Sequence, residues 1–174
     1  MKPALDFIEI VERAAKPRTT GLTLVRDPGF GLQMLRVHLE TAAPFIDYAK
    51  MRNLTPRLFP ESLLVDKVAL YREYQIEVFF GGIVFEAAWL QGQVDRAIAY
   101  ASRFGVKTVE ISDNIITLSL EEKLDFVRRY LDAGVSVLYE WGKKYPTAPL
   151  EPVRAADEIG RLLALGVSRV ILEE

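Results

Sequence analysis

Segments with the periodicity of β-strands and of amphipathic helices alternate along this chain. Short runs rich in β-branched and aromatic residues are each followed by a stretch whose apolar residues recur every three or four positions. The predicted strands are Thr20–Asp27, Phe45–Met51, Glu77–Phe80, Thr108–Ser112, Val135–Glu140 and Arg169–Glu173. The predicted helices are Gly31–Ala43, Pro60–Tyr74, Phe85–Phe104, one that Ser119 opens, and Val153–Leu165. An amphipathic lead-in precedes them, with Leu5, Ile8 and Val11 on one face.

Short sequence signals mark where the helices begin and end. Ser119-Leu-Glu-Glu122 is a capping box, in which the serine and the glutamate satisfy each other's backbone N–H groups. Three helices stop at the pairs Gly105-Val106, Gly134-Val135 and Gly166-Val167. Because glycine readily takes the left-handed conformation that ends a helix, we expect short loops into the next strand at these pairs.

The regular alternation predicts one α/β domain that spans residues 1–174. Strand starts lie about 30 residues apart, the length of one βα unit. Six such units require a parallel sheet covered by helices, and both a doubly wound sheet and a (β/α) barrel satisfy this pattern. The only dinucleotide-like feature is Gly29-Phe-Gly31, which lacks the third glycine because Met34 stands there. A plain βα turn explains this feature better than a dinucleotide site.

Composition removes several classes of function. The 174 residues are 50% hydrophobic and 26% charged with a net charge of −2, so nucleic acid is not expected as a partner. There is no cysteine and only one histidine, His38, which excludes disulfides, thiolate metal sites, a cysteine nucleophile and histidine triads. No signal peptide or apolar run of about 18 residues is present, so we expect a cytoplasmic protein without a membrane partner.

Charged residues gather where the predicted strands end. The set comprises Asp27, Lys50, Glu110 with Ser112, Glu140 with Lys143, and Glu173, and Gly81-Gly82 and Glu86 follow the third strand. Because the carboxyl ends of parallel strands share one rim, we expect a common site there, where carboxylates bind Mg²⁺ and a lysine stabilises an anion. The alternatives are a ring of salt bridges inside the barrel and, for the glycines, a tight turn. Asp113, Lys144 and Glu174 are expected at solvated loop positions.

Seven short motifs, in order and at nearly constant spacing, resemble the phosphosulfolactate synthase family of (β/α)₈ barrel enzymes. They are Lys16-Pro-Arg18, Gly21-Leu-Thr-Leu-Val-Arg-Asp27-Pro-Gly29, Phe45-Ile-Asp-Tyr-Ala-Lys50, Gly81-Gly-Ile-Val-Phe-Glu86, Gln91-Gly92, Val109-Glu-Ile-Ser-Asp113 and Glu140-Trp-Gly-Lys-Lys144. The resemblance implies a TIM-type barrel that adds sulfite to phosphoenolpyruvate with Mg²⁺, in a coenzyme M-type pathway.

The resemblance also gives the strand-end residues their expected roles. In that reaction, sulfite attacks the methylene carbon, an enediolate forms, and an acid protonates the neighbouring carbon. The expected catalytic residues are Lys50, Lys143 and Glu110, and the expected substrate-binding residues are Arg18, Asp27, Gly81, Gly82 and Ser112. Glu86, Glu140 and Glu173 are the expected metal ligands. A metal ion and an ammonium both suit an intermediate whose charge appears only during the reaction.

Two features depart from the family pattern. After Lys50 the family carries Phe-Gly-Trp-Gly-Thr-Ser, whereas this chain reads Met51-Arg-Asn-Leu-Thr-Pro56. The family also continues for roughly two βα units beyond the sixth strand. We therefore expect an incomplete barrel of about six units, which is either a fragment or closes its sheet as a homo-oligomer. Two alternative functions remain: a diverged member that binds a small phosphorylated or acidic ligand, and an assembly role.

Overall fold

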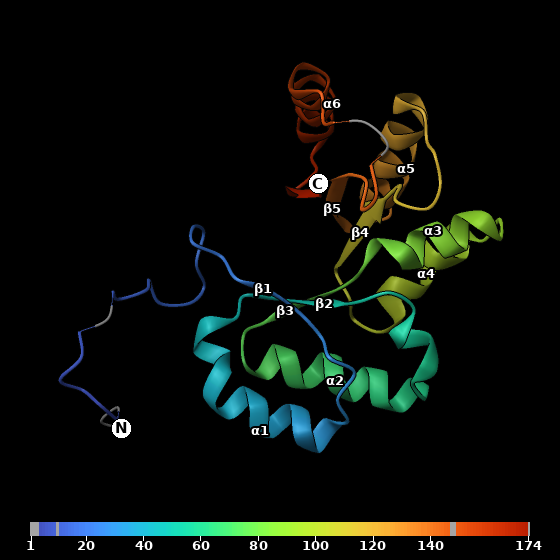
Figure 1. Cartoon of the computed structure of the whole chain (residues 1–174). Helices are drawn as coiled ribbons and strands as arrows, with labels where there is room; N and C mark the ends of the chain where they lie inside the picture. Colours follow the sequence, from blue (N-terminus) through green and yellow to red (C-terminus); the bar gives the residue numbers. More distant parts are fainter. Residues whose placement is uncertain (1–3, 10, 147–148, 174) are drawn as a thin grey trace.

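Six parallel strands form one sheet whose spatial order follows the chain (Figure 1). The computed structural model describes residues 4–9, 11–146 and 149–173. The strands are β1 (Leu24–Arg26), β2 (Tyr48–Met51), β3 (Glu77–Phe80), β4 (Thr108–Ser112), β5 (Ser136–Gly142) and β6 (Arg169–Glu173). The α-helices are α1 (Leu32–Ala42), α2 (Glu61–Glu73), α3 (Gly82–Leu90), α4 (Val94–Arg103), α5 (Leu120–Asp132) and α6 (Pro152–Leu165).

All the crossover helices cover the same face of the sheet. Each strand pairs with the next one along the chain, and right-handed crossovers that always advance in one direction put every helix on one side. Ala49, Val109 and Val137 point toward that helical layer and belong to the buried apolar core. Lys50 and Glu110, which alternate with them, therefore point to the other, concave face.

The sheet is strongly curled. The guanidinium of Arg169 on β6 lies 4.8 Å from the ring centre of Tyr48 on β2, across the concave face. In a flat sheet, strands four places apart would be about 19 Å from each other, since neighbours are about 4.8 Å apart. The curl and the single helical layer are those of a TIM-type (β/α) barrel, here with six units. Among the described residues, β1 pairs only with β2, and β6 only with β5.

Most predicted element boundaries are confirmed. β3, β4 and β6 have the predicted bounds, and the capping box between Ser119 and Glu122 is formed at the start of α5. Gly105, Gly134 and Gly166 all have positive φ angles, as the helix-ending glycines require. These glycines redirect the chain from the outer helices back into the sheet.

Three predictions about the elements need correction. The predicted helix Phe85–Phe104 is two helices, because Gly92 has φ 63° and separates α3 from α4. The first two strands are shorter than predicted: β1 covers only Leu24–Arg26, and β2 begins at Tyr48 because Ala43–Phe45 form a 3₁₀ helix. The described part of the amphipathic lead-in is irregular, and Val11 is 94% exposed. So short a segment lacks the packing that an isolated helix needs to be stable.

No helix in the described ranges has the length and apolar character that crossing a bilayer would require.

Candidate active site

Lys50, Glu110 and Glu140 meet on the concave face near the carboxyl ends of their strands. The Lys50 ammonium lies 2.7 Å from Glu110 Oε1 and 2.7 Å from Glu140 Oε2. β2, β4 and β5 supply these three side chains, so the curl of the sheet is what brings them together. The two glutamates are almost completely buried, and the lysine side chain is 14% exposed. We call this cluster the lysine–carboxylate triad.

Within the triad, Glu110 is the group that releases its proton near neutral pH. Burial raises the pKa of Glu110 to about 7; the Lys50 charge opposes this rise, and the Glu140 charge adds to it. Burial also acts on Glu140, but hydrogen bonds from Lys50 and Asn114 outweigh it and lower the pKa of that carboxyl group. For Lys50, burial lowers the pKa, but the two carboxylates more than compensate and raise it overall. The ammonium and the Glu140 carboxylate therefore stay charged, while Glu110 can donate a proton.

Glu110 has one carboxylate oxygen to spare. Its Oε1 atom accepts hydrogen bonds from Lys50 and from the backbone N–H of Gly82, the latter at 2.7 Å. Its Oε2 atom is buried and has no hydrogen-bond partner among the described residues. A buried unpaired oxygen is costly unless it carries a proton or meets a ligand. Both possibilities suit an acid that acts on a bound substrate.

The paired glycines make room for protein side chains at this site. A Cβ atom on Gly81 would lie 2.9 Å from Lys50 Cε, and one on Gly82 would lie 2.6 Å from Ser112 Cβ. Gly81 and Gly82 were predicted to bind substrate, with a tight turn as the alternative. The structure instead shows that they let Lys50 and Ser112 pack against the start of α3. The side chains of Lys50 and Ser112 thus fill the space beside Gly81 and Gly82.

Glu86 points from α3 to the loop after β4 and is fully buried. One carboxylate oxygen accepts hydrogen bonds from Ser112 Oγ and from the backbone N–H of Asn114, the latter at 3.0 Å. The other accepts from the N–H groups of Ile115 and Ile116, at 2.6 and 3.3 Å. The Ser112 hydroxyl, predicted to bind substrate, thus donates to Glu86.

The three carboxylates that were predicted to hold Mg²⁺ do not form such a site. Both oxygens of Glu86 and both of Glu140 accept hydrogen bonds from protein donors, and only the Glu173 side chain has no such contact among the described residues. No group of three or more carboxylates or imidazoles is arranged around a metal position in the described ranges. The side chains present therefore do not fit the predicted three-carboxylate magnesium centre.

Lys143 lies apart from Lys50 and is bound to the loop after β4. Its ammonium donates to the carbonyl oxygens of Asp113 and Ile116, the latter at 2.7 Å. Asp113 was predicted to be solvated but is 5% exposed, because Lys123 at 3.4 Å and Lys143 at 3.5 Å both pair with its carboxylate. Lys144 is exposed, as predicted. Glu174 lies outside the described residues.

Asp27 and Arg18 point away from the triad. The Asp27 carboxylate lies on the helical side of the sheet, 2.9 Å from Lys67 Nζ and 2.7 Å from Tyr71 Oη. Arg18 pairs with Asp47 at 3.1 Å, at the amino end of β2 and so at the end of the sheet opposite the rim. Of the predicted site residues, these two are therefore not brought together with Lys50.

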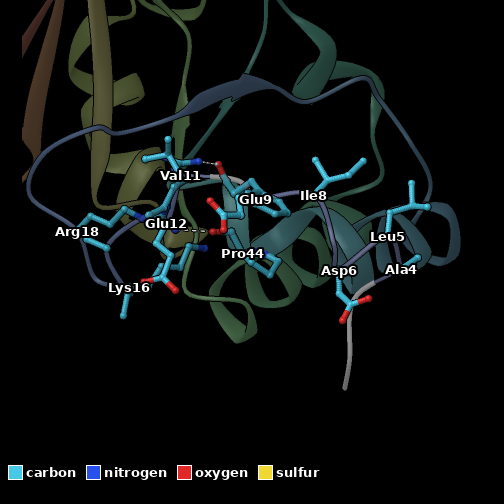
Figure 2. A pocket seen from close by; sticks show the side chains of 14 residues that line it. Ala4, Leu5, Asp6, Ile8, Glu9, Val11, Glu12, Lys16, Arg18 and Pro44 are labelled. Carbon is cyan, nitrogen blue, oxygen red and sulfur yellow. Dashed lines mark hydrogen bonds between the residues drawn. The ribbon is translucent and has the colours of Figure 1, made fainter.

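Two large cavities have linings that include no residue of the triad. A cavity of about 960 Å³ is enclosed by the amino-terminal segment, with Lys16, Arg18 and Pro44 on its wall (Figure 2). It lies at the amino end of the strands, away from the charged rim. A second cavity of about 700 Å³ is lined by Lys143, Glu173 and other residues at the carboxyl ends of β5 and β6. Of these two cavities, the second opens at the end of the sheet where a (β/α) barrel carries its chemistry.

Sequence reasoning missed two residues that matter at the rim. Asn114 donates from its side chain to Glu140 Oε1 and accepts from the Lys144 N–H at 3.2 Å. Arg26 is in register with Lys50 on the adjacent strand, so the two side chains share the concave face. It is exposed and makes no side-chain ion pair or hydrogen bond within the described part of the chain. Asn114 lies in a loop and Arg26 lies in β1, and no pattern in the sequence around either residue indicated that it would lie beside the triad.

Comparison with known proteins agrees with the resemblance. Residues 11–174 match the family model described as (2R)-phospho-3-sulfolactate synthase (ComA). The phosphosulfolactate synthase of Methanothermobacter thermautotrophicus is 33% identical over 98% of this chain and 66% of its own length. That of Bacillus subtilis is 32% identical over 80% of this chain and 54% of its own length. A third relative, from Methanocaldococcus jannaschii, is 33% identical over 72% of this chain and 50% of its own. The chain thus spans between half and two thirds of the length of these relatives.

Solved structures of low sequence identity share the fold alone. A truncated 3-deoxy-D-arabino-heptulosonate 7-phosphate synthase from Thermotoga maritima matches 87% of this chain and 50% of its own, with a TM-score of 0.50 and 11% identity. A glycerophosphoryl diester phosphodiesterase from Parabacteroides distasonis matches 87% of this chain and 46% of its own, with a TM-score of 0.50 and 8% identity.

Proposed function

This chain belongs to the phosphosulfolactate synthase family, and from that premise we propose that it takes part in the addition of sulfite to phosphoenolpyruvate, which yields phosphosulfolactate. The observation that carries the proposal is the lysine–carboxylate triad, in which an ammonium and a protonatable carboxyl group lie side by side. The reaction needs both groups. It builds negative charge on the substrate carboxylate and then requires a proton at the neighbouring carbon.

Lys50 stabilises the intermediate. Sulfur attacks the methylene carbon and forms the carbon–sulfur bond, while the electron pair of the double bond moves onto the carboxylate as an enediolate. The Lys50 ammonium is held at 2.7 Å by each of two carboxylates, so it does not have to reorganise when this charge appears. Preorganised charge in a site with little water is the most effective form of electrostatic stabilisation.

Glu110 completes the addition by protonating the carbon that bears the phosphate. This step consumes the proton of the carboxyl group and collapses the enediolate to a carboxylate, so that sulfite, phosphoenolpyruvate and one proton give phosphosulfolactate. A pKa of about 7 keeps roughly half of the Glu110 carboxyl groups protonated at neutral pH. Lys50 is a weaker candidate for the donor, because its carboxylate partners raise its pKa. Solvent reprotonates Glu110 after product leaves.

The remaining anionic groups of the substrates bind at the carboxyl ends of β5 and β6. Lys143 lines the cavity of about 700 Å³ there, and its side chain is 37% exposed, so it can contact phosphate or sulfite. No step is assigned to Mg²⁺, because the carboxylates predicted to bind it do not converge. We further propose that the protein acts in the cytoplasm on soluble metabolites and assembles from copies of itself.

Turnover is tested by following phosphoenolpyruvate and its product by ³¹P NMR, with Mg²⁺ present. The proposal predicts loss of phosphoenolpyruvate only when sulfite is added, with one new phosphate ester and no free phosphate. Thermal stabilisation by phosphoenolpyruvate without any turnover would refute the synthase activity and favour a ligand-binding protein.

A further inference from the structure

The loop after β4, Asp113–Ile116, is held by one buried carboxylate. Three consecutive backbone N–H groups, those of Asn114, Ile115 and Ile116, point at Glu86 and donate to it at 2.6 to 3.3 Å. Successive N–H groups that point inward form a concave site for an anion, and here the anion is part of the protein. We call this segment the Glu86-bound loop.

Within the part of the chain that the structure describes, Glu86 has no cation to neutralise it. It is 0% exposed, and no lysine or arginine pairs with it among the described residues. A buried carboxylate without a counter-ion is costly, and hydrogen bonds to its charged form are what offset that cost. Because the three amides belong to one loop, their hydrogen bonds to the buried Glu86 carboxylate fix the loop backbone.

The Glu86-bound loop contacts two residues of the proposed reaction. From its first half, the Asn114 side chain donates to Glu140 Oε1, the oxygen that does not face Lys50. From its two ends, the carbonyl oxygens of Asp113 and Ile116 accept from the Lys143 ammonium. The loop therefore holds Glu140 of the triad on one side and Lys143 on the other.

We propose that Glu86 and Asn114 are positioning residues of the active site. Glu86 fixes the loop, and Asn114 transmits this constraint to Glu140, which in turn holds the Lys50 ammonium in place. This inference rests on the proposed function, since the group being positioned is the one that stabilises the enediolate. Glu86 itself is fully buried, so it does not contact a substrate.

Glutamine at position 86 and alanine at position 114 test this proposal in the whole chain. In Glu86→Gln an amide NH₂ replaces one acceptor oxygen and faces N–H donors, so the loop is released. Displacement of a reacting group by about 1 Å can cost about 100-fold in rate, and we expect kcat to fall by roughly that factor. Asn114→Ala should lower kcat in the same direction while it leaves the Glu86 contacts intact. The double variant should be no slower than Glu86→Gln, because residues that act in series are not additive.

Hydrogen exchange supplies a measurement that does not depend on turnover. The amides of residues 114–116 should exchange faster in Glu86→Gln but not in Asn114→Ala. Glu122→Gln is the matched control, because Glu122 also accepts a backbone N–H, from Ser119 at 2.8 Å, but at the exposed start of α5. It should leave both kcat and the 114–116 amides unchanged.

Each result points to one conclusion. Normal kcat in Asn114→Ala, or a double variant whose losses multiply, would overturn the positioning role while leaving the synthase proposal standing. Unchanged exchange at 114–116 in Glu86→Gln would overturn the role of Glu86 as the anchor. A wild-type chain without sulfite-dependent turnover would refute the proposed function itself. Should Glu86→Gln fail to fold, Asn114→Ala still decides whether the loop acts through Glu140.

Discussion

Replacing Glu110 by glutamine should make the stability of the protein less dependent on pH. The pKa of this carboxyl group rises from 4.5 to about 7 on folding, chiefly because it is buried. Above pH 4.5 the unfolded chain releases the proton, whereas the folded chain keeps it until about pH 7. The free energy of unfolding therefore falls across this window and is constant above it. At 1.36 kcal/mol for each pKa unit, the loss attributable to Glu110 is about 3 kcal/mol.

Urea unfolding of wild type and Glu110→Gln, measured from pH 4.5 to 8, checks this magnitude. From pH 4.5 to pH 8, the free energy of unfolding of Glu110→Gln should rise by about 3 kcal/mol relative to that of the wild type. Glu140→Gln is the internal control for sign. Burial acts against ionisation of Glu140, but hydrogen bonds from Lys50 and Asn114 outweigh it and lower the pKa in the folded state. Its stabilisation is therefore lost only as the pH falls below 4.5, and this control is followed to lower pH than the rest of the series. A difference between wild type and Glu110→Gln that stays constant with pH would refute the electrostatic account of the triad.

Further substitutions probe the packing and charge around the site. Gly82→Ala should destabilise the fold by about 1 to 3 kcal/mol in thermal unfolding, because the added Cβ overlaps Ser112. Lys67→Ala should cost about 3 to 5 kcal/mol in urea unfolding, because it leaves the buried Asp27 carboxylate without its cation. Arg26→Ala should raise the KM for phosphoenolpyruvate several-fold with little change in kcat, because this guanidinium is exposed on the concave face and free to bind an anion.

Each of these substitutions has a matched control elsewhere in the chain. Gly160→Ala adds a Cβ that meets no atom within 4 Å and should not destabilise α6. Lys144→Ala removes an exposed lysine and should leave the free energy of unfolding within about 0.5 kcal/mol of wild type. Arg128→Ala removes an exposed arginine on α5 and should leave KM unchanged. Equal effects in a substitution and its control would show that the structural reason given for it is wrong.

The fold could be predicted largely from local signals. The capping box at Ser119, the left-handed glycines and the apolar strand runs are each contained in a few consecutive residues. The capping box, the glycines and the strands β3, β4 and β6 all lie where they were predicted. The break between α3 and α4 was missed, because apolar periodicity continues on both sides of Gly92. Periodicity reports which face of an element is buried, but a single left-handed residue decides whether the helix continues.

The candidate site was less predictable, because its contacts join residues far apart in the sequence. The positions of Lys50, Glu110 and Glu140 at strand ends follow from the βα pattern. Their meeting across the concave face depends on the curl of the sheet, which no local pattern reveals. For the same reason Asp113 was expected in solvent, although Lys123 from α5 and Lys143 from beyond β5 cover it.

The role of Glu86 also lay beyond sequence reasoning. A glutamate near the start of a helix fits a metal ligand, a substrate contact and a buried anchor equally well by residue type. Only the coordinates show three backbone amides converging on it. Residue type therefore indicates that Glu86 has a role, and the geometry shows which contacts it makes.

Alanine at Lys50 tests the central claim most directly. In the ³¹P NMR assay with sulfite and phosphoenolpyruvate, the wild type should form the product, and Lys50→Ala should lower kcat by at least about 100- to 1,000-fold, the usual loss when one stabilising group is removed. Unfolding of both proteins at the same pH would show that the variant is folded. A folded Lys50→Ala protein that makes phosphosulfolactate at the wild-type rate would contradict the account.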